Sequence, residues 1–131
     1  MIKSTEKIHV LIVEDDPFLS NIYQTKFDME GFKVSTADNG QSGLDDAKKK
    51  KPDVILLDIL LPSMNGFEIL KQLKRDKETK DIPVIVLTNL GSKHVDDDKK
   101  LALLLGAEDY LVKTYHQPQE ILEKISVYLP T

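Results

Sequence analysis

The feature that most constrains this chain is an almost unbroken apolar run at residues 53–62, Asp-Val-Ile-Leu-Leu-Asp-Ile-Leu-Leu-Pro. A short apolar run that ends in a turn signal is typical of a strand in a parallel sheet that is covered on both faces. Ligands of such sheets bind beyond the carboxyl ends of the strands. The run therefore predicts a buried strand that carries Asp58 to the edge of the sheet where chemistry takes place.

The rest of the chain alternates between strand and helix patterns. We predict further strands at 9–13, 32–37, 82–87 and 108–112, and helices at about 17–31, 41–50, 67–73, 96–105 and 117–129. This alternation favours an α/β, doubly wound fold of the flavodoxin type, with a five-stranded parallel sheet in the order 2-1-3-4-5 and five helices on its two faces. A chain of 131 residues predicts a single domain, 1–131, with its core at about 8–129.

Three local signals set the limits of helices. Asp16 precedes Pro17 and suits the N-cap of the first helix. Gly106 is expected to end the fourth helix, and the three acids at 96–98 are interpreted as its solvated first turn.

Composition excludes several classes of function. The chain has no cysteine, which rules out a thiol nucleophile or a thiolate metal site, and its net charge of −4 argues against direct binding of nucleic acid. No apolar run approaches the ~20 residues of a membrane span, and residues 1–7 lack the apolar segment of a signal peptide. We therefore expect a cytoplasmic protein that does not bind membranes.

Polar residues end four of the predicted strands, and parallel strands place these ends on one edge of the sheet. They are Glu14 with Asp15, then Asp58, Thr88 and Lys113. Three carboxylates brought together repel one another unless cations offset them. Oxygen ligands without His or Cys suit Mg²⁺ (or Mn²⁺), while a hydroxyl and an ammonium group suit phosphoryl oxygens. The set predicts phosphoryl transfer onto Asp58, which would leave an acyl phosphate.

These residues stand in a specific pattern. It consists of Val13-Glu14-Asp15 after the first strand, Asp58 with Pro62 and Gly66 four and eight residues on, Thr88, and Tyr110 three residues before Lys113. With this pattern the chain resembles the response-regulator receiver domains of two-component signalling and is similar to the chemotaxis regulator CheY, over about residues 8–128.

The resemblance implies a role for each acid. Asp58 would be the phosphoacceptor, and Asp15 and Asp58 would be direct metal ligands. Glu14 would act largely through a metal-bound water, and the backbone carbonyl of Leu60 would be the third protein ligand.

The resemblance also implies a switch. Thr88 and Lys113 would contact the phosphoryl group, and Tyr110 would move inward when Thr88 is drawn to it, which changes the surface of the fourth helix, fifth strand and fifth helix. The phosphodonor would be a sensor histidine kinase or a histidine phosphotransfer protein, and the output an unknown downstream protein. The domain would be a monomer or a phosphorylation-dependent dimer. It would not be an enzyme, apart from catalysing the phosphorylation and dephosphorylation of its own Asp58.

The chain departs from the family pattern at a few positions. Thr114 follows Lys113 where relatives usually have proline, and Asn89 is larger than the residue usual after the threonine. Leu60 and Leu90 stand where relatives carry polar side chains that place the attacking water, so we hypothesise slow self-dephosphorylation.

Two other functions compete with the phosphorylation switch. The first is a pseudo-receiver, a binding module that recognises its partner unphosphorylated, and Thr114 keeps this alternative open. The second is a phosphatase of the haloacid-dehalogenase type with Asp58 as nucleophile. Such enzymes need a second Asp two residues later, where this chain has Leu60.

Overall fold

The computed structural model describes residues 8–59, 61, 64–88, 95–112 and 118–129. In these residues one sheet of five parallel strands has the order β2-β1-β3-β4-β5. The strands are β1 (His9–Val13), β2 (Lys33–Ala37), β3 (Val54–Asp58), β4 (Val84–Thr88) and β5 (Asp109–Val112). The helices are α1 (Pro17–Met29), α2 (Gly40–Lys50), α3 (Gly66–Arg75), α4 (Val95–Leu104) and α5 (Pro118–Ser126). The predicted fold class and strand order are confirmed.

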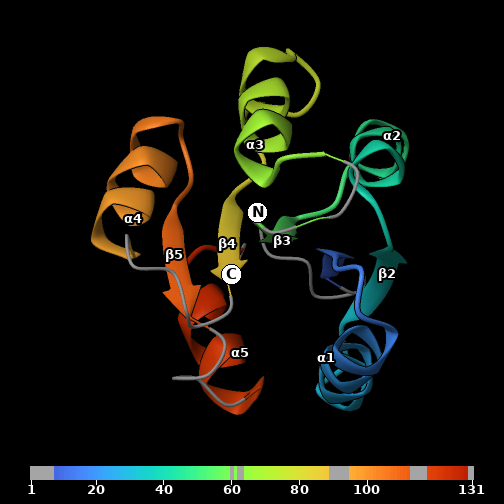
Figure 1. The fold of residues 1–131 in the computed structure, drawn as a ribbon. Helices are drawn as coiled ribbons and strands as arrows, with labels where there is room; N and C mark the ends of the chain where they lie inside the picture. Colours follow the sequence, from blue (N-terminus) through green and yellow to red (C-terminus); the bar gives the residue numbers. More distant parts are fainter. Residues whose placement is uncertain (1–7, 60, 62–63, 89–94, 113–117, 130–131) are drawn as a thin grey trace.

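The helices form two layers, one on each face of the sheet (Figure 1). α1 and α5 lie below the sheet in that view, and α2, α3 and α4 lie above it. Two separate apolar clusters fill the space between the layers. One joins the sheet to side chains of α2, α3 and α4, and the other joins it to side chains of α1 and α5. The sheet is thus covered on both faces, as the apolar run predicted.

The position of β3 explains why its sequence is continuously apolar. β3 lies in the middle of the sheet between β1 and β4, and all five of its residues are buried. Ile55 and Leu57 belong to the cluster under α2, α3 and α4, whereas Val54 and Leu56 belong to the opposite cluster. Successive side chains point to opposite faces, and both faces are dry, so no polar residue interrupts the run before Asp58.

The helix limits follow the local signals. The Asp16 side chain accepts hydrogen bonds from the backbone N–H groups of Phe18 and Leu19, as an N-cap does. Gly106 follows α4 with a φ of +109°, a left-handed conformation that favours glycine. Both predictions are confirmed.

Some predicted limits differ from the observed ones, most clearly the start of β4 and the end of α5. β4 begins at Val84 rather than 82 because the Ile82 N–H bonds to Thr79 in a turn, and Pro83 has no N–H for a ladder. α5 ends at Ser126 rather than 129 because the last two amides bond three residues back, Tyr128 to Ile125 and Leu129 to Ser126. Such bonds mark a tightened final turn.

No helix within the described residues is long and apolar enough to cross a membrane.

Candidate functional site: an acid cluster at the carboxyl edge of the sheet

Three acids meet where β1 and β3 end. Glu14 and Asp15 directly follow β1, Asp58 is the last residue of β3, and the two strands are neighbours in register, with Val13 beside Leu57. Each acid offers one carboxylate oxygen, and these oxygens all lie within 4.8 Å of one another. Glu14 and Asp58 are buried, whereas Asp15 is exposed. The predicted convergence of the acids is confirmed.

Glu14 is fixed from two sides. Its backbone N–H donates to the carbonyl of Ala37 at the end of β2, at 2.9 Å. Its carboxylate accepts a hydrogen bond from the Asp16 N–H at 3.2 Å, just before α1. These bonds hold the carboxylate at the start of the helix without neutralising its charge.

The turn after β3 explains why a glycine stands at position 66. A Cβ atom placed on Gly66 would lie 2.5 Å from the Ile59 Cα and 2.7 Å from the Ile59 carbonyl oxygen. The Gly66 N–H also donates to that carbonyl at 3.1 Å. The backbone leaving Asp58 therefore folds closely against the start of α3, and only glycine fits there.

Thr88 is the polar residue at the end of the neighbouring strand. β4 pairs with β3 so that Asp58 lies beside Leu87, which puts Thr88 one residue further along, and Thr88 is 1% exposed. Its partner on β5 is Val112. Lys113 and Leu60, which sequence analysis assigned to the site, lie outside the described residues, as do Asn89, Leu90 and Thr114.

Tyr110 lies on β5 with its ring turned into the protein. The residue is 4% exposed and belongs to the apolar cluster under α2, α3 and α4. Burial raises the pKa of its phenol, the nearby Thr88 side chain opposes that rise, and the charge of Asp98 on α4 adds to it. The phenol oxygen has no hydrogen-bond partner among the described residues. β5 pairs with β4 so that Tyr110 lies beside Val86, two residues before Thr88, which brings the side chains of Tyr110 and Thr88 close together on one face of the sheet.

The sequence of residues 10–126 matches the model of the response regulator receiver domain. The chain belongs to this family. It is 38% identical over 120 residues to the "DNA-binding dual master transcriptional regulator RpaA" of Synechocystis, covering 92% of this chain and 48% of that protein. It is 39% identical over 118 residues to the response regulator SaeR of Staphylococcus aureus, covering 90% and 49%. The receiver domain therefore spans about half the length of these relatives.

Solved structures agree. The fold is similar to the Vibrio cholerae chemotaxis protein CheY4, with a TM-score of 0.85 and 27% identity over 95% of this chain and 100% of that one. It is also similar to the BeF₃-activated receiver domain of Klebsiella pneumoniae RstA, with a TM-score of 0.82 and 28% identity over 94% and 99%.

Family membership gives the general role of the domain. Response regulators accept phosphoryl groups from histidine kinases, and a phosphorylation switch is the standard role of their receiver domains in two-component signalling. Receiver domains are signalling switches rather than true enzymes, and they bind Mg²⁺ through an acidic cluster.

The donor set of this receiver domain fits such an ion. Glu14, Asp15 and Asp58 supply only carboxylate oxygens, which suit Mg²⁺ or Mn²⁺ and disfavour a soft metal. Two of the three groups are buried, so their mutual repulsion is poorly screened by water. A divalent cation offsets that repulsion.

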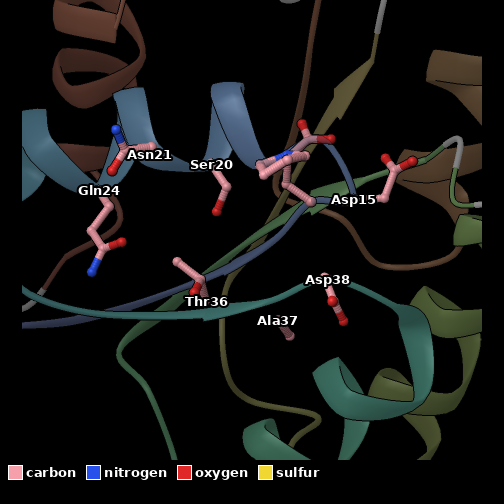
Figure 2. Close-up of a pocket in the computed structure, with 9 residues that line it drawn as sticks. Asp15, Ser20, Asn21, Gln24, Thr36, Ala37 and Asp38 are labelled. Carbon is pink, nitrogen blue, oxygen red and sulfur yellow. The ribbon is translucent and has the colours of Figure 1, made fainter.

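Sequence analysis missed a polar groove beside the cluster. Figure 2 shows it between α1, which contributes Ser20, Asn21 and Gln24, and the end of β2, which contributes Thr36. The cavity has a volume of about 360 Å³, and its lining comprises Glu14, Asp15, Pro17, Ser20, Asn21, Gln24, Thr36, Ala37 and Asp38. Polar residues at positions 20, 21 and 24 of the first helix were the available signal, but only the packing of α1 shows that they face β2.

Proposed function

We propose that this receiver domain is a phosphoryl-accepting switch and that Asp58 is its phosphoacceptor. The observation that carries the proposal is the meeting of Glu14, Asp15 and Asp58 within 4.8 Å at the end of the central strand. Thr88 ends the adjacent strand, so a hydroxyl donor stands next to the acceptor. This is the arrangement that phosphoryl transfer to a carboxylate requires.

Asp58 would act as the nucleophile. One of its carboxylate oxygens bonds to phosphorus while the bond from phosphorus to the donor histidine nitrogen breaks. The histidine leaves as neutral imidazole, because its other ring nitrogen keeps its proton. Asp15 and Asp58 would hold Mg²⁺ directly, with the Leu60 carbonyl as a third protein ligand and Glu14 acting through water. When bound, the ion offsets negative charge on the carboxylates and the phosphoryl oxygens.

Thr88 and Lys113 would hold the phosphoryl oxygens that remain. The Thr88 hydroxyl donates to one oxygen, and the Lys113 ammonium offsets the charge of another. Sequence analysis predicted that Tyr110 moves inward when Thr88 turns toward the phosphoryl group, but its ring is already buried in this structure. Tyr110 would therefore stay inward while the surface of α4, β5 and α5 changes. A local change of charge is thereby converted into a surface that a partner can recognise.

The donor would be a sensor histidine kinase or a histidine phosphotransfer protein in the cytoplasm. The output would be an unknown downstream protein or a further part of a longer regulator. The domain would act as a monomer or as a phosphorylation-dependent dimer. RpaA is named as a DNA-binding regulator, but the net charge of −4 argues against DNA as a ligand of this domain itself. We assign it no direct contact with nucleic acid.

The decisive experiment is to incubate the protein with Mg²⁺ and acetyl phosphate and to follow its intact mass. We expect the mass of one phosphoryl group to be added to the parent and none to Asp58→Asn, because the amide is not a nucleophile. Asp38→Asn is the matched control, since Asp38 is an exposed acid of the adjacent groove. A parent that gains no phosphoryl group, or an Asp58→Asn variant that gains one, contradicts the proposal.

We also propose that Asp58 and its neighbours catalyse loss of the phosphoryl group slowly. Leu60 and Leu90 offer no polar side chain to place the attacking water. Leu60→Asn should therefore shorten the half-life of the phosphorylated protein, measured by the decay of its intact mass. A parent half-life of seconds, or an unchanged half-life in the variant, speaks against this idea.

The second candidate is a pseudo-receiver, and the threonine after Lys113 is the observation that favours it. It predicts that no Mg²⁺-dependent change occurs at Asp58 with acetyl phosphate or beryllofluoride. The same mass measurement therefore separates the two candidates.

A further inference from the structure

The buried hydroxyl of Tyr110 is the starting point. The residue is 4% exposed, and its phenol oxygen has no hydrogen-bond partner among the described residues. Buried hydroxyl groups are nearly always hydrogen-bonded, because leaving one unpaired costs the hydration that it had in water. A donor held in this condition is better satisfied in another state of the domain.

Asp98 lies on the face of α4 that is turned toward Tyr110. Asp98 and Ala102 are one helical turn apart and so share a face, and Ala102 is fully buried in the same apolar cluster as Tyr110. Asp98 is half-buried, whereas its neighbour Asp97 is exposed. The charge of Asp98 contributes to the raised pKa of the Tyr110 phenol, which agrees with this placement.

Sequence analysis interpreted the acids at 96–98 as a solvated helix terminus. Asp97 is exposed, as that interpretation predicts, whereas Asp98 is half-buried in the first turn of α4. The side chain of Asp96 lies outside what the structure describes. Asp98 therefore differs from Asp97, because it lies on the face of α4 that carries Ala102 and its charge acts on the Tyr110 phenol.

We propose that Asp98 is a positioning residue that accepts a hydrogen bond from the Tyr110 hydroxyl in the phosphorylated state, and so fixes α4 against β5. The proposal rests on the phosphorylation switch proposed above and names a residue that controls it. The bond forms when α4 shifts over the sheet, and it stabilises the state in which Tyr110 stays inside.

Thr88 is the other polar side chain close to the Tyr110 hydroxyl, and it is the poorer partner in that state. Its own hydroxyl proton is directed to the phosphoryl group, and its backbone is fixed in the sheet. A carboxylate makes the stronger, charge-assisted hydrogen bond. Asp98 also belongs to a helix, and helices slide on packed sheets more readily than strands move within them.

The test compares the affinity of the parent and five variants for beryllofluoride, measured by titration calorimetry at saturating Mg²⁺. Asp98→Ala and Tyr110→Phe should each weaken binding roughly tenfold, the size expected for a hydrogen bond to a charged acceptor that is made only in the bound state. The double variant should be no weaker than either single variant, because both remove the same bond. Asp97→Ala is the matched control and should stay within about twofold of the parent.

Asp98→Asn shows whether a loss of affinity in Asp98→Ala comes from the missing hydrogen-bond acceptor or from misfolding. Its amide oxygen still accepts a hydrogen bond, so it should recover part of the lost affinity. An Asp98→Ala affinity equal to that of the parent, or losses that add in the double variant, would overturn the role of Asp98. A parent that neither binds beryllofluoride nor gains a phosphoryl group at Asp58 would instead overturn the proposed function together with this inference.

Discussion

The two edges of the sheet differ in how far their polar groups are hydrogen-bonded within the protein. At the amino edge, polar atoms find partners within the protein. The His9 ring lies 2.7 Å from the Ser35 hydroxyl, and the Lys74 ammonium donates to two backbone carbonyls, those of Lys80 and Ile82. The Thr79 hydroxyl donates to a carbonyl of α3 at 2.6 Å.

At the carboxyl edge, three carboxylates gather and one hydroxyl donor has no partner among the described residues. Glu14, Asp15 and Asp58 bring carboxylate oxygens within 4.8 Å, and the Tyr110 hydroxyl has no partner among the described residues. Local unfavourable interactions of this kind persist where a ligand or a second state relieves them. From this comparison we expect substitutions at the amino edge to change mainly stability, and substitutions at the carboxyl edge to change mainly the response to metal and phosphodonor.

The largest expected effect comes from relieving the acid cluster with metal. If the folded cluster binds Mg²⁺ and the unfolded chain does not, as we propose, Mg²⁺ at about a hundred times its Kd should raise the free energy of unfolding by about 2.7 kcal/mol. Urea unfolding with Mg²⁺ and with a chelator measures this gain.

Two exposed acids, one inside the cluster and one outside it, test whether the metal effect comes from the cluster. Asp15→Asn should lose most of the Mg²⁺ gain, and without metal it should be at least as stable as the parent because one repelling charge is gone. Asp38→Asn should keep the gain, since Asp38 is outside the cluster. Equal responses in both variants would contradict a metal site at these acids.

A smaller effect on stability is expected from removing the Lys74 ammonium at the amino edge. Lys74→Met leaves the two carbonyls without their donor, which should lower the free energy of unfolding by about 1 kcal/mol near neutral pH. The response to Mg²⁺ and acetyl phosphate should not change, because Lys74 is at the opposite edge from Asp58.

The pH dependence of the free energy of unfolding gives a second test of Lys74. Burial lowers the pKa of Lys74 in the folded state below 10.5, so the unfolded chain binds more protons between the two values. The stability that Lys74 contributes should therefore rise as pH increases through its lowered pKa toward 10.5. Lys74→Met should lose that rise in urea unfolding, whereas Lys77→Met, at an exposed lysine, should keep it.

The sequence predicts most of the carboxyl edge because strand ends are local signals. Asp58 ends an apolar run and Asp16 precedes a proline, and parallel strands then bring such ends together without further information. The groove beside α1 and the inner position of Asp98 were not predictable in this way. Both depend on the rotation of a helix about its own axis, which tertiary packing decides and a short polar segment does not encode.

The smallest expected effect compares the two edges most directly, through one hydroxyl at each. Without phosphodonor, Tyr110→Phe should change the free energy of unfolding by less than about 0.5 kcal/mol or raise it slightly, because the hydroxyl that it removes is buried and unpaired. Thr79→Val should lower it by about 1 kcal/mol, because that hydroxyl is buried and bonded to Leu73. Urea unfolding of both variants gives the comparison. A loss in Tyr110→Phe as large as that in Thr79→Val would mean that the Tyr110 hydroxyl is already satisfied in the resting state, and the contrast between the two edges would then rest on the acids alone.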